Sequence, residues 1–121
     1  MAKVIYIADD ETAIRIAVKV FLENAGFKVE DFATGDDLLD RFKKEPSDLV
    51  ILDIMMPGSN GFAICKAIRE DSDVPVIMLS ARDSDLDSAT GLAMGCNYYF
   101  TKPFSPMVLA QKVQEIFEEA E

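Results

Sequence analysis

The sequence predicts an α/β protein of (βα)5 type, in which a doubly wound, five-stranded parallel sheet carries helices on both faces. Short apolar runs of strand length alternate five times with stretches whose apolar residues recur at helical spacing. The segments between them are short, and right-handed crossovers then place successive helices on the faces of a parallel sheet. The chain has 121 residues, so we expect one domain over residues 1–121 and no second domain in this chain.

The first two strand and helix pairs occupy the N-terminal third of the chain. Residues 4–7 form an apolar run of strand length, and a helix follows until Gly26 ends it. The apolar residues at helical spacing in that helix are Ile14, Ala17, Val18, Phe21, Leu22 and Ala25. Residues 27–32 predict a more polar strand near a sheet edge, and residues 36–44 predict a helix that stops before Pro46. The inner side of this second helix is expected to carry Leu38, Leu39 and Phe42.

The third pair begins with a wholly apolar strand. Residues 49–52 contain no polar side chain, which is typical of a strand covered on both faces. Pro57 and Gly58 mark a loop, and Asn60 is a candidate N-cap for the next helix. The apolar side of that helix is expected to carry Ile64, Ala67 and Ile68.

The last two pairs differ in the quality of their helices. Residues 76–79 form a second wholly apolar run, and we expect a labile helix over residues 84–93, because its aspartates, serines, threonine and glycine have poor helix propensity. Gly95 is expected to end that helix, and residues 98–101 predict the fifth strand. The buried side of the final helix is expected to carry Val108, Leu109, Val113, Ile116 and Phe117.

The charge balance excludes several classes of function. The sequence has 12 basic and 22 acidic residues and no histidine, which gives a formal net charge of -10. Nucleic acids and anionic membranes are normally bound through basic patches, so direct binding of either is not expected. Without histidine, histidine-dependent catalysis and His-ligated zinc are excluded. Cys65 and Cys96 lack the spacing of a zinc site or a redox dithiol, so we expect buried free thiols in a reducing cytoplasm. The apolar stretches are too short for a signal peptide or a membrane span, so neither is expected.

Polar side chains at the ends of four predicted strands form the candidate site. Ligands of doubly wound sheets bind beyond the carboxyl ends of the strands. Asp9 and Asp10 follow the first strand, Asp53 the third, Ser80 the fourth and Lys102 the fifth. Three carboxylates in one crevice repel one another unless a cation is present. Oxygen ligands that leave room for water and phosphate favour Mg²⁺.

This set of side chains suits phosphoryl transfer. Carboxylates can attack a phosphoryl donor to form an aspartyl phosphate, and a metal neutralises charge on the oxygens being transferred. Asp53 is the candidate nucleophile, and Lys102 is the expected partner for the phosphoryl charge. The Ser80 hydroxyl is a candidate hydrogen-bonding group for another phosphoryl oxygen.

The chain resembles a known family in four features. Residues 5–11, residues 49–61 (LVILDIMMPGSNG), Ser80 and residues 95–104 (GCNYYFTKPF) are similar to the receiver domain of bacterial two-component response regulators. The resemblance covers essentially the whole chain, and the motifs follow the family's order and spacing. It implies a flavodoxin-like strand order, 2-1-3-4-5, and a role in phosphorelay signalling in the bacterial cytoplasm.

The resemblance assigns a role to each acidic residue of the candidate site. It implies that Asp53 is the phosphoacceptor and also contacts the metal. Asp10 would ligate Mg²⁺ directly, Asp9 would act through water, and the backbone carbonyl of Met55 would complete the protein ligands.

The resemblance also implies how the signal enters and leaves the domain. Ser80 and Lys102 would bind the phosphoryl group, the peptide bond before Pro103 would be cis, and Tyr99 would be an aromatic switch. The donor would be a phosphohistidine on a sensor histidine kinase or a histidine phosphotransfer protein. Phosphorylation would change the surface formed by the fourth helix, the fifth strand and the fifth helix, and would control a downstream protein or an output domain. On physical grounds the expected two-state element is the fourth helix, predicted over residues 84–93, because its helix propensity is poor and it is joined to Ser80. The chain would catalyse its own phosphorylation and dephosphorylation and would not otherwise be an enzyme.

Two groups of residues depart from the family's common pattern. Members joined to winged-helix domains commonly dimerise through a charged network whose positions here are Thr90, Asn97, Tyr98 and Lys112. The residues found there do not favour that dimer. Met55 offers no hydrogen bond to orient an attacking water, so we expect slow self-dephosphorylation, whereas Arg82 could shield or contact the phosphate.

Three alternative functions have weaker support. Asp10 followed by Thr12 faintly resembles the nucleophile motif of Mg²⁺-dependent haloacid dehalogenase-type phosphatases, but the chain is short and lacks their acidic partner two residues later. A receiver used only as an interaction module would be favoured had Asp53 or Lys102 been replaced. A flavodoxin-like nucleotide-binding protein is disfavoured because acids, not a glycine-rich loop, follow the first strand.

Overall fold

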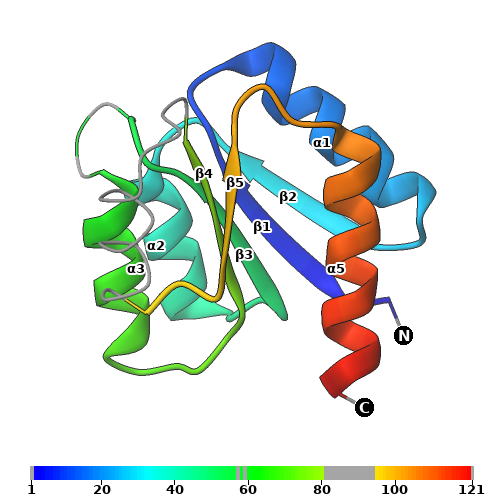
Figure 1. Cartoon of the computed structure of the whole chain (residues 1–121). Helices are drawn as coiled ribbons and strands as arrows, with labels where there is room; N and C mark the ends of the chain where they lie inside the picture. Colours follow the sequence, from blue (N-terminus) through cyan, green and yellow to red (C-terminus); the bar gives the residue numbers. More distant parts are fainter. Residues whose placement is uncertain (1, 57, 59, 81–94, 121) are drawn as a thin grey trace.

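A five-stranded sheet between two layers of helices makes up the computed structural model, which describes residues 2–56, 58, 60–80 and 95–120 (Figure 1). The strands are β1 (Val4–Ala8), β2 (Lys28–Phe32), β3 (Leu49–Asp53), β4 (Val76–Ser80) and β5 (Tyr98–Thr101). The helices are α1 (Thr12–Asn24), α2 (Gly35–Lys44), α3 (Gly61–Arg69) and α5 (Pro106–Ala120). The helix predicted over residues 84–93 lies outside the described residues.

The strands are all parallel and lie in the order β2-β1-β3-β4-β5. This confirms the predicted doubly wound sheet, its strand order and the edge position of the polar second strand. Asp53 pairs in register with Leu79, and Ser80 with Thr101. The carboxyl ends of neighbouring strands therefore meet at one edge of the sheet, where the candidate site was predicted.

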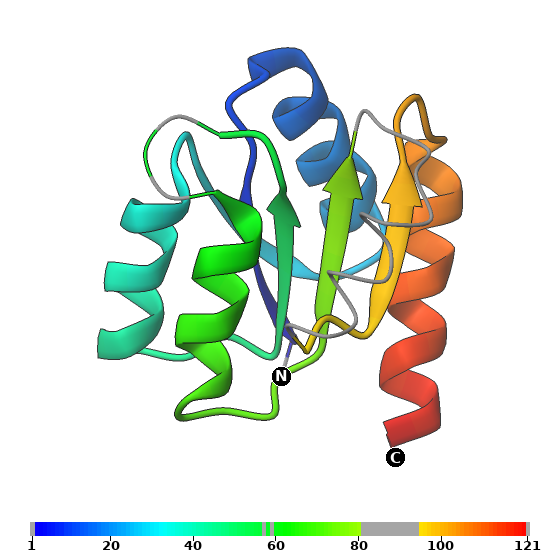
Figure 2. The same ribbon diagram turned by 60° about the vertical axis from the view of Figure 1, so that its left-hand side comes forward.

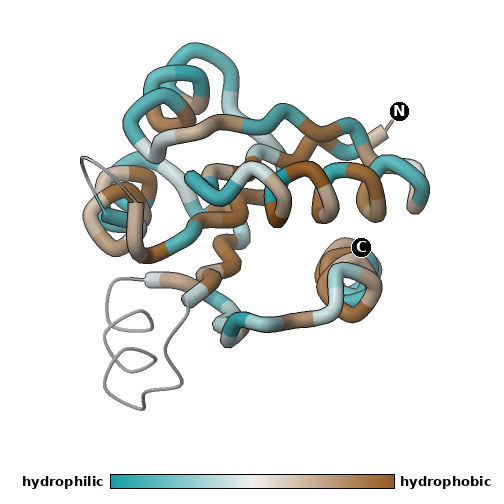
Figure 3. The backbone as a smooth tube through the Cα atoms, turned by 90° about the horizontal axis from the view of Figure 1, so that it is seen from above, coloured by the Kyte–Doolittle hydropathy of each residue, from teal (hydrophilic) through white to brown (hydrophobic). Residues whose placement is uncertain are grey.

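Each face of the sheet is covered by two of the described helices (Figure 2). The cluster on one face joins sheet residues such as Tyr6 and Leu52 to α2 and α3, and the cluster on the other joins Ile7 and Ile51 to α1 and α5. Figure 3 shows hydrophobic and hydrophilic stretches alternating along the helices, as expected of elements with one face on the sheet. Successive strand residues point to opposite faces, so the apolar runs of β3 and β4 supply both cores.

Local sequence signals account for two of the helix ends. The Asn60 side chain accepts a hydrogen bond of 3.0 Å from the backbone N–H of Ala63, which confirms the predicted N-cap of α3. Gly26 follows α1 with φ of +99°, a left-handed conformation that glycine adopts readily. This agrees with the predicted end of the first helix.

The prediction for the buried side of the last helix was wrong at one position. Val108 is 48% exposed, whereas Leu109 and Val113 are fully buried. Residues four apart lie on one helix face, but Val108 is one residue and about 100° away from Leu109. Ala110 takes its place among the buried residues of α5.

Two further findings concern thiols and membranes. Neither Cys65 nor Cys96 forms a disulfide bond, and both side chains are buried, as predicted. Within the described part of the chain, no helix has the length and apolar character needed to cross a membrane.

Candidate functional site

The carboxyl ends of four strands bring the predicted site residues together. Asp9 directly follows β1, Asp53 and Ser80 are the last residues of β3 and β4, and Lys102 directly follows β5. The side chains of Asp9, Asp53 and Ser80 are almost completely buried, although all three are polar. The parallel topology therefore places buried polar groups from separate segments at one edge of the sheet.

Three carboxylates form a cluster that can hold a metal ion. One oxygen each from Asp9, Asp10 and Asp53 lie within 4.8 Å of one another, and Asp10 is the exposed member. All three donors are carboxylate oxygens, which suit a hard divalent cation such as Mg²⁺. The exposure of Asp10 leaves this side of the cluster in contact with solvent.

Lys102 places a positive charge within this cluster. Its Nζ lies 3.1 Å from Asp9 Oδ2, 3.4 Å from Asp53 Oδ2 and 3.0 Å from Glu11 Oε1, and its side chain is only 8% exposed. Burial works against protonation of Lys102, but the hydrogen bond to Glu11 and the charges of Asp53 and Asp9 outweigh it and raise its pKa. Lys102 is therefore a buried ammonium group held against the phosphoacceptor candidate.

The environment of Asp53 opposes its ionisation. Burial and repulsion from Asp9 raise the pKa of Asp53 to about 7, and the opposing attraction of Lys102 does not cancel them. The single buried ammonium group of Lys102 is thus insufficient to neutralise the carboxylates around it. A divalent cation would relieve this excess of negative charge.

Main-chain hydrogen bonds fix the turn that carries the first two acids. The backbone N–H of Asp9 donates to the Phe32 carbonyl at 3.2 Å, and the backbone N–H of Glu11 donates to Asp9 Oδ1 at 2.9 Å. Arg15 Nη1 donates to the Asp9 carbonyl at 2.8 Å. Sequence reasoning missed Arg15 and Glu11 as members of the site. Glu11 had one signal, its place directly after two aspartates, whereas Arg15 had none.

The end of β5 joins the site to the neighbouring strand. The backbone N–H of Lys102 donates to the Ser80 carbonyl, and the Lys102–Pro103 peptide bond is cis. Tyr99 pairs in register with Met78 of β4 and its half-buried ring packs against the core on the α2 and α3 face. Met55, two residues beyond Asp53, has a side chain that is 57% exposed.

Three of the four positions of the charged dimer network, Asn97, Tyr98 and Lys112, lie in the described residues. The Asn97 side chain accepts hydrogen bonds from Arg69 Nη2 at 2.7 Å and from the Val76 backbone N–H at 2.8 Å. The Lys112 ammonium group lies 4.4 Å from the centre of the Tyr98 ring. These side chains are engaged within the chain itself. Thr90 and Arg82, for which roles were also considered, lie outside the described residues.

Comparison with known proteins identifies the family. The model of the response regulator receiver domain matches residues 5–114. Regulatory protein VanR of Enterococcus faecium is 40% identical over 114 residues, which cover 94% of this chain and 49% of VanR. Transcriptional regulatory protein YvrH of Bacillus subtilis is 42% identical over 111 residues, which cover 91% of this chain and 47% of YvrH. The chain thus spans about half the length of the curated relatives it matches.

Solved structures agree with the sequence comparison. The BeF3-activated receiver domain of DrrB, a Thermotoga maritima protein, superimposes with a TM-score of 0.91 at 33% identity, covering 98% of this chain and 99% of that one. The chemotaxis response regulator CheY4 of Vibrio cholerae gives a TM-score of 0.90 at 32% identity, covering 96% and 99%. The chain therefore belongs to the response regulator receiver domain family, whose members act in two-component phosphorelay signalling.

Proposed function

We propose that residues 1–121 form a single receiver domain that accepts a phosphoryl group on Asp53 in a Mg²⁺-dependent reaction. The donor is the phosphohistidine of a sensor histidine kinase or of a histidine phosphotransfer protein, encountered in the cytoplasm. The observation that carries this proposal is the cluster of Asp9, Asp10 and Asp53 with the Lys102 ammonium group among them. The chain has no histidine of its own, so the phosphohistidine must come from a partner.

The residues present fit a magnesium ion. The cluster offers only carboxylate oxygens, and the raised pKa of Asp53 indicates an excess of negative charge there. Asp10 and Asp53 would bind the ion directly, Asp9 through water, and the main-chain carbonyl of Met55 would complete the protein ligands. When bound, Mg²⁺ supplies neutralisation of charge on the phosphoryl oxygens during transfer.

The side chains of this chain perform the remaining steps. A carboxylate oxygen of Asp53 forms the new bond to phosphorus as the bond between phosphorus and the donor imidazole nitrogen breaks. Lys102 Nζ, 3.4 Å from Asp53 Oδ2, donates to a phosphoryl oxygen, and the Ser80 hydroxyl donates to another. These contacts compensate the added negative charge, and the chain catalyses only the gain and loss of its own phosphoryl group.

The output leaves through the β4 and β5 side of the domain. Movement of the Ser80 hydroxyl toward the phosphoryl group makes room for Tyr99 to turn inward, which changes the surface formed by β5, α5 and the helix that the sequence predicts over residues 84–93. That surface controls a downstream protein or an output domain. The net charge of -10 argues against direct binding of nucleic acid or an anionic membrane by this domain.

Intact-mass measurement after incubation with acetyl phosphate tests the proposal. We expect a single phosphoryl adduct that requires Mg²⁺ and is absent from an Asp53→Asn variant. An Asp10→Asn variant should form the adduct only at higher Mg²⁺, because Asp10 serves the metal and not the phosphoryl group. An adduct that persists in Asp53→Asn, or no adduct in a folded wild-type chain, would contradict the proposal.

A further inference from the structure

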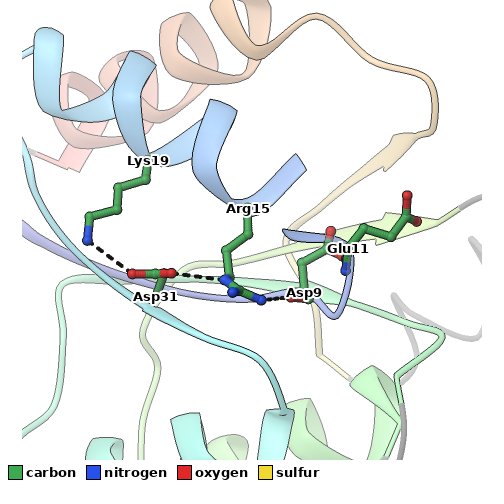
Figure 4. A network of polar contacts seen from close by, with 5 residues as sticks. All are labelled: Asp9, Glu11, Arg15, Lys19 and Asp31. Atoms are coloured by element: carbon green, nitrogen blue, oxygen red, sulfur yellow. Dashed lines mark hydrogen bonds and ion pairs between the residues drawn. The ribbon is translucent and has the colours of Figure 1, made fainter. Parts of the chain in front are cut away.

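A polar network links the end of β2 to the acidic turn after β1 (Figure 4). Arg15 of α1 donates from Nε to Asp31 Oδ2 at 2.9 Å and from Nη1 to the main-chain carbonyl of Asp9 at 2.8 Å. Lys19, one helical turn further along α1, donates to Asp31 Oδ1 at 3.0 Å. The Arg15 guanidinium group therefore bridges the Asp31 carboxylate on β2 and the main-chain carbonyl of Asp9 in the candidate metal site.

The network is well enough shielded from water to be ordered. The Arg15 side chain is 15% exposed and the Asp31 side chain 25% exposed. Burial opposes ionisation of Asp31, but the hydrogen bonds from Lys19 and Arg15 outweigh it and lower the pKa of Asp31. Asp31 remains charged near neutral pH and holds the planar guanidinium group in one orientation.

The network acts on the main chain between the first two acids. The Asp9 N–H is bonded to the Phe32 carbonyl at the end of β2, and the Asp9 carbonyl is bonded to Arg15, which Asp31 of the same strand holds. Both backbone polar groups of Asp9 are therefore tied to β2. The carbonyl bonded by Arg15 belongs to the peptide that joins Asp9 to Asp10, so the position of Asp10, an exposed side chain, depends on it.

We propose that Arg15 is a positioning residue, which Asp31 holds in place, that orients the Asp9–Asp10 turn for binding of the divalent cation. The inference rests on the proposed Mg²⁺-dependent function. Arg15 contacts neither the cation nor the phosphoryl group, and it acts through the Asp9 carbonyl. Residues that support metal ligands in this way typically change metal affinity by about 10-fold to 100-fold when they are removed.

This role can be separated from the effect of charge alone. Removal of a positive charge near an acidic site should strengthen Mg²⁺ binding by simple electrostatics. Loss of the positioning contact should weaken it. An Arg15→Met variant therefore gives opposite results under the two explanations, and Arg15→Lys removes the two-pronged contact while it keeps the charge.

Calorimetric titration of the metal-free chain with Mg²⁺ tests the proposal. The variants are Arg15→Met, Arg15→Lys, Asp31→Asn and the double variant Arg15→Met/Asp31→Asn. Arg41→Met is the matched control, because Arg41 of α2 pairs at 3.3 Å with Glu30, the β2 residue beside Asp31, without a contact to Asp9. Thermal unfolding without Mg²⁺ checks that each variant is folded, and the rate of phosphorylation by acetyl phosphate is measured across Mg²⁺ concentrations.

We expect Arg15→Met and Arg15→Lys to weaken Mg²⁺ binding by about 10-fold. Arg41→Met should change it by less than about twofold, because exposed charges are screened. Asp31→Asn alone should weaken Mg²⁺ binding, but in the double variant it should add nothing to the effect of Arg15→Met. Saturating Mg²⁺ should largely restore the phosphorylation rate of the Arg15 and Asp31 variants. Unchanged or tighter binding by a folded Arg15→Met or Arg15→Lys chain would overturn the inference while leaving the proposed function intact. A wild-type chain that binds no Mg²⁺ would overturn both.

Discussion

The Asp53 carboxyl group combines burial with close negative neighbours, so its protonation is coupled to folding. Its pKa is raised from 3.8 to about 7 in the folded chain. Between these pH values the unfolded state binds fewer protons than the folded state, so the free energy of unfolding decreases as pH rises. Above about pH 7 both states are ionised at this site and the decrease ends.

A comparison of wild type with Asp53→Asn without metal should reveal this coupling. From pH 5 to pH 8 the variant should gain about 3 kcal/mol of stability relative to wild type, because Asp53 stays protonated in the folded state over about two pH units of that range and each unit corresponds to about 1.4 kcal/mol. Urea unfolding at the two pH values, in the presence of a chelator, measures the difference. A pH-independent difference between the two chains would show that Asp53 ionises normally in the folded state.

Met55 should influence how long the phosphoryl group survives. Its exposed side chain lies two residues beyond Asp53 and offers no group that can orient an attacking water. The side-chain amide of an asparagine at this position would supply such a hydrogen bond, so Met55→Asn should lose the phosphoryl group several-fold faster, which corresponds to about 1 kcal/mol of barrier. Decay of the intact-mass adduct after removal of acetyl phosphate measures the rate. Slower decay in the variant than in wild type would contradict the argument.

At the scale of elements, α3 begins in direct contact with the end of β3. A Cβ atom on Gly61 would lie 2.6 Å from the Asp53 carbonyl oxygen and 3.0 Å from the Ile54 Cα. Both are backbone atoms, so neither can move away as the end of a flexible side chain could. The absence of a side chain at Gly61 therefore allows α3 to start where it does.

Gly61→Ala should displace the phosphoacceptor end of β3. We expect a loss of about 1–3 kcal/mol in unfolding free energy, the usual cost of forcing extra atoms into a packed site, and slower phosphorylation. Thermal unfolding and the acetyl phosphate reaction measure the two effects. Ala63→Ser on the exposed side of the same helix turn is the control. Wild-type behaviour of Gly61→Ala in both measurements would refute this account of the contact.

At the scale of the whole molecule, the sequence predicts most of the architecture because its signals are local. The apolar runs that form β3 and β4 are typical of buried strands, and parallel topology then brings Asp9, Asp53 and Lys102 to one edge of the sheet. The buried face of the last helix was harder to predict. Apolar residues stand at successive positions there, so packing decides which of them is buried, and Val108 lies on the solvent side.

Long-range polar contacts could not be predicted in the same way. Arg15 and Asp31 are 16 residues apart, and their contact depends on how α1 lies against β2. Glu11 reaches Lys102 across 91 residues of sequence. Charged residues are common on protein surfaces. No local sequence pattern therefore distinguishes Arg15 and Asp31, which support the acidic turn, from charged residues that only face solvent.

The acidity of the whole domain predicts how metal binding affects its stability. The net charge is -10, and three of the acids meet at one end of the sheet, where Mg²⁺ would bind to the folded state only. At a concentration 10 times the dissociation constant, such binding adds about 1.4 kcal/mol to the free energy of unfolding. For a domain of this size, that corresponds to an increase of about 3–6 °C in melting temperature.

Thermal unfolding with MgCl₂, and with KCl at the same ionic strength, separates binding from general screening of the negative charge. We expect MgCl₂ to raise the melting temperature of wild type well above the value in KCl, and EDTA to reverse the gain. The excess should be much smaller in Asp53→Asn and Asp10→Asn, because each lacks a proposed metal ligand. Equal gains in the two salts would mean that screening alone stabilises the chain, and the acidic cluster would then have no special affinity for Mg²⁺.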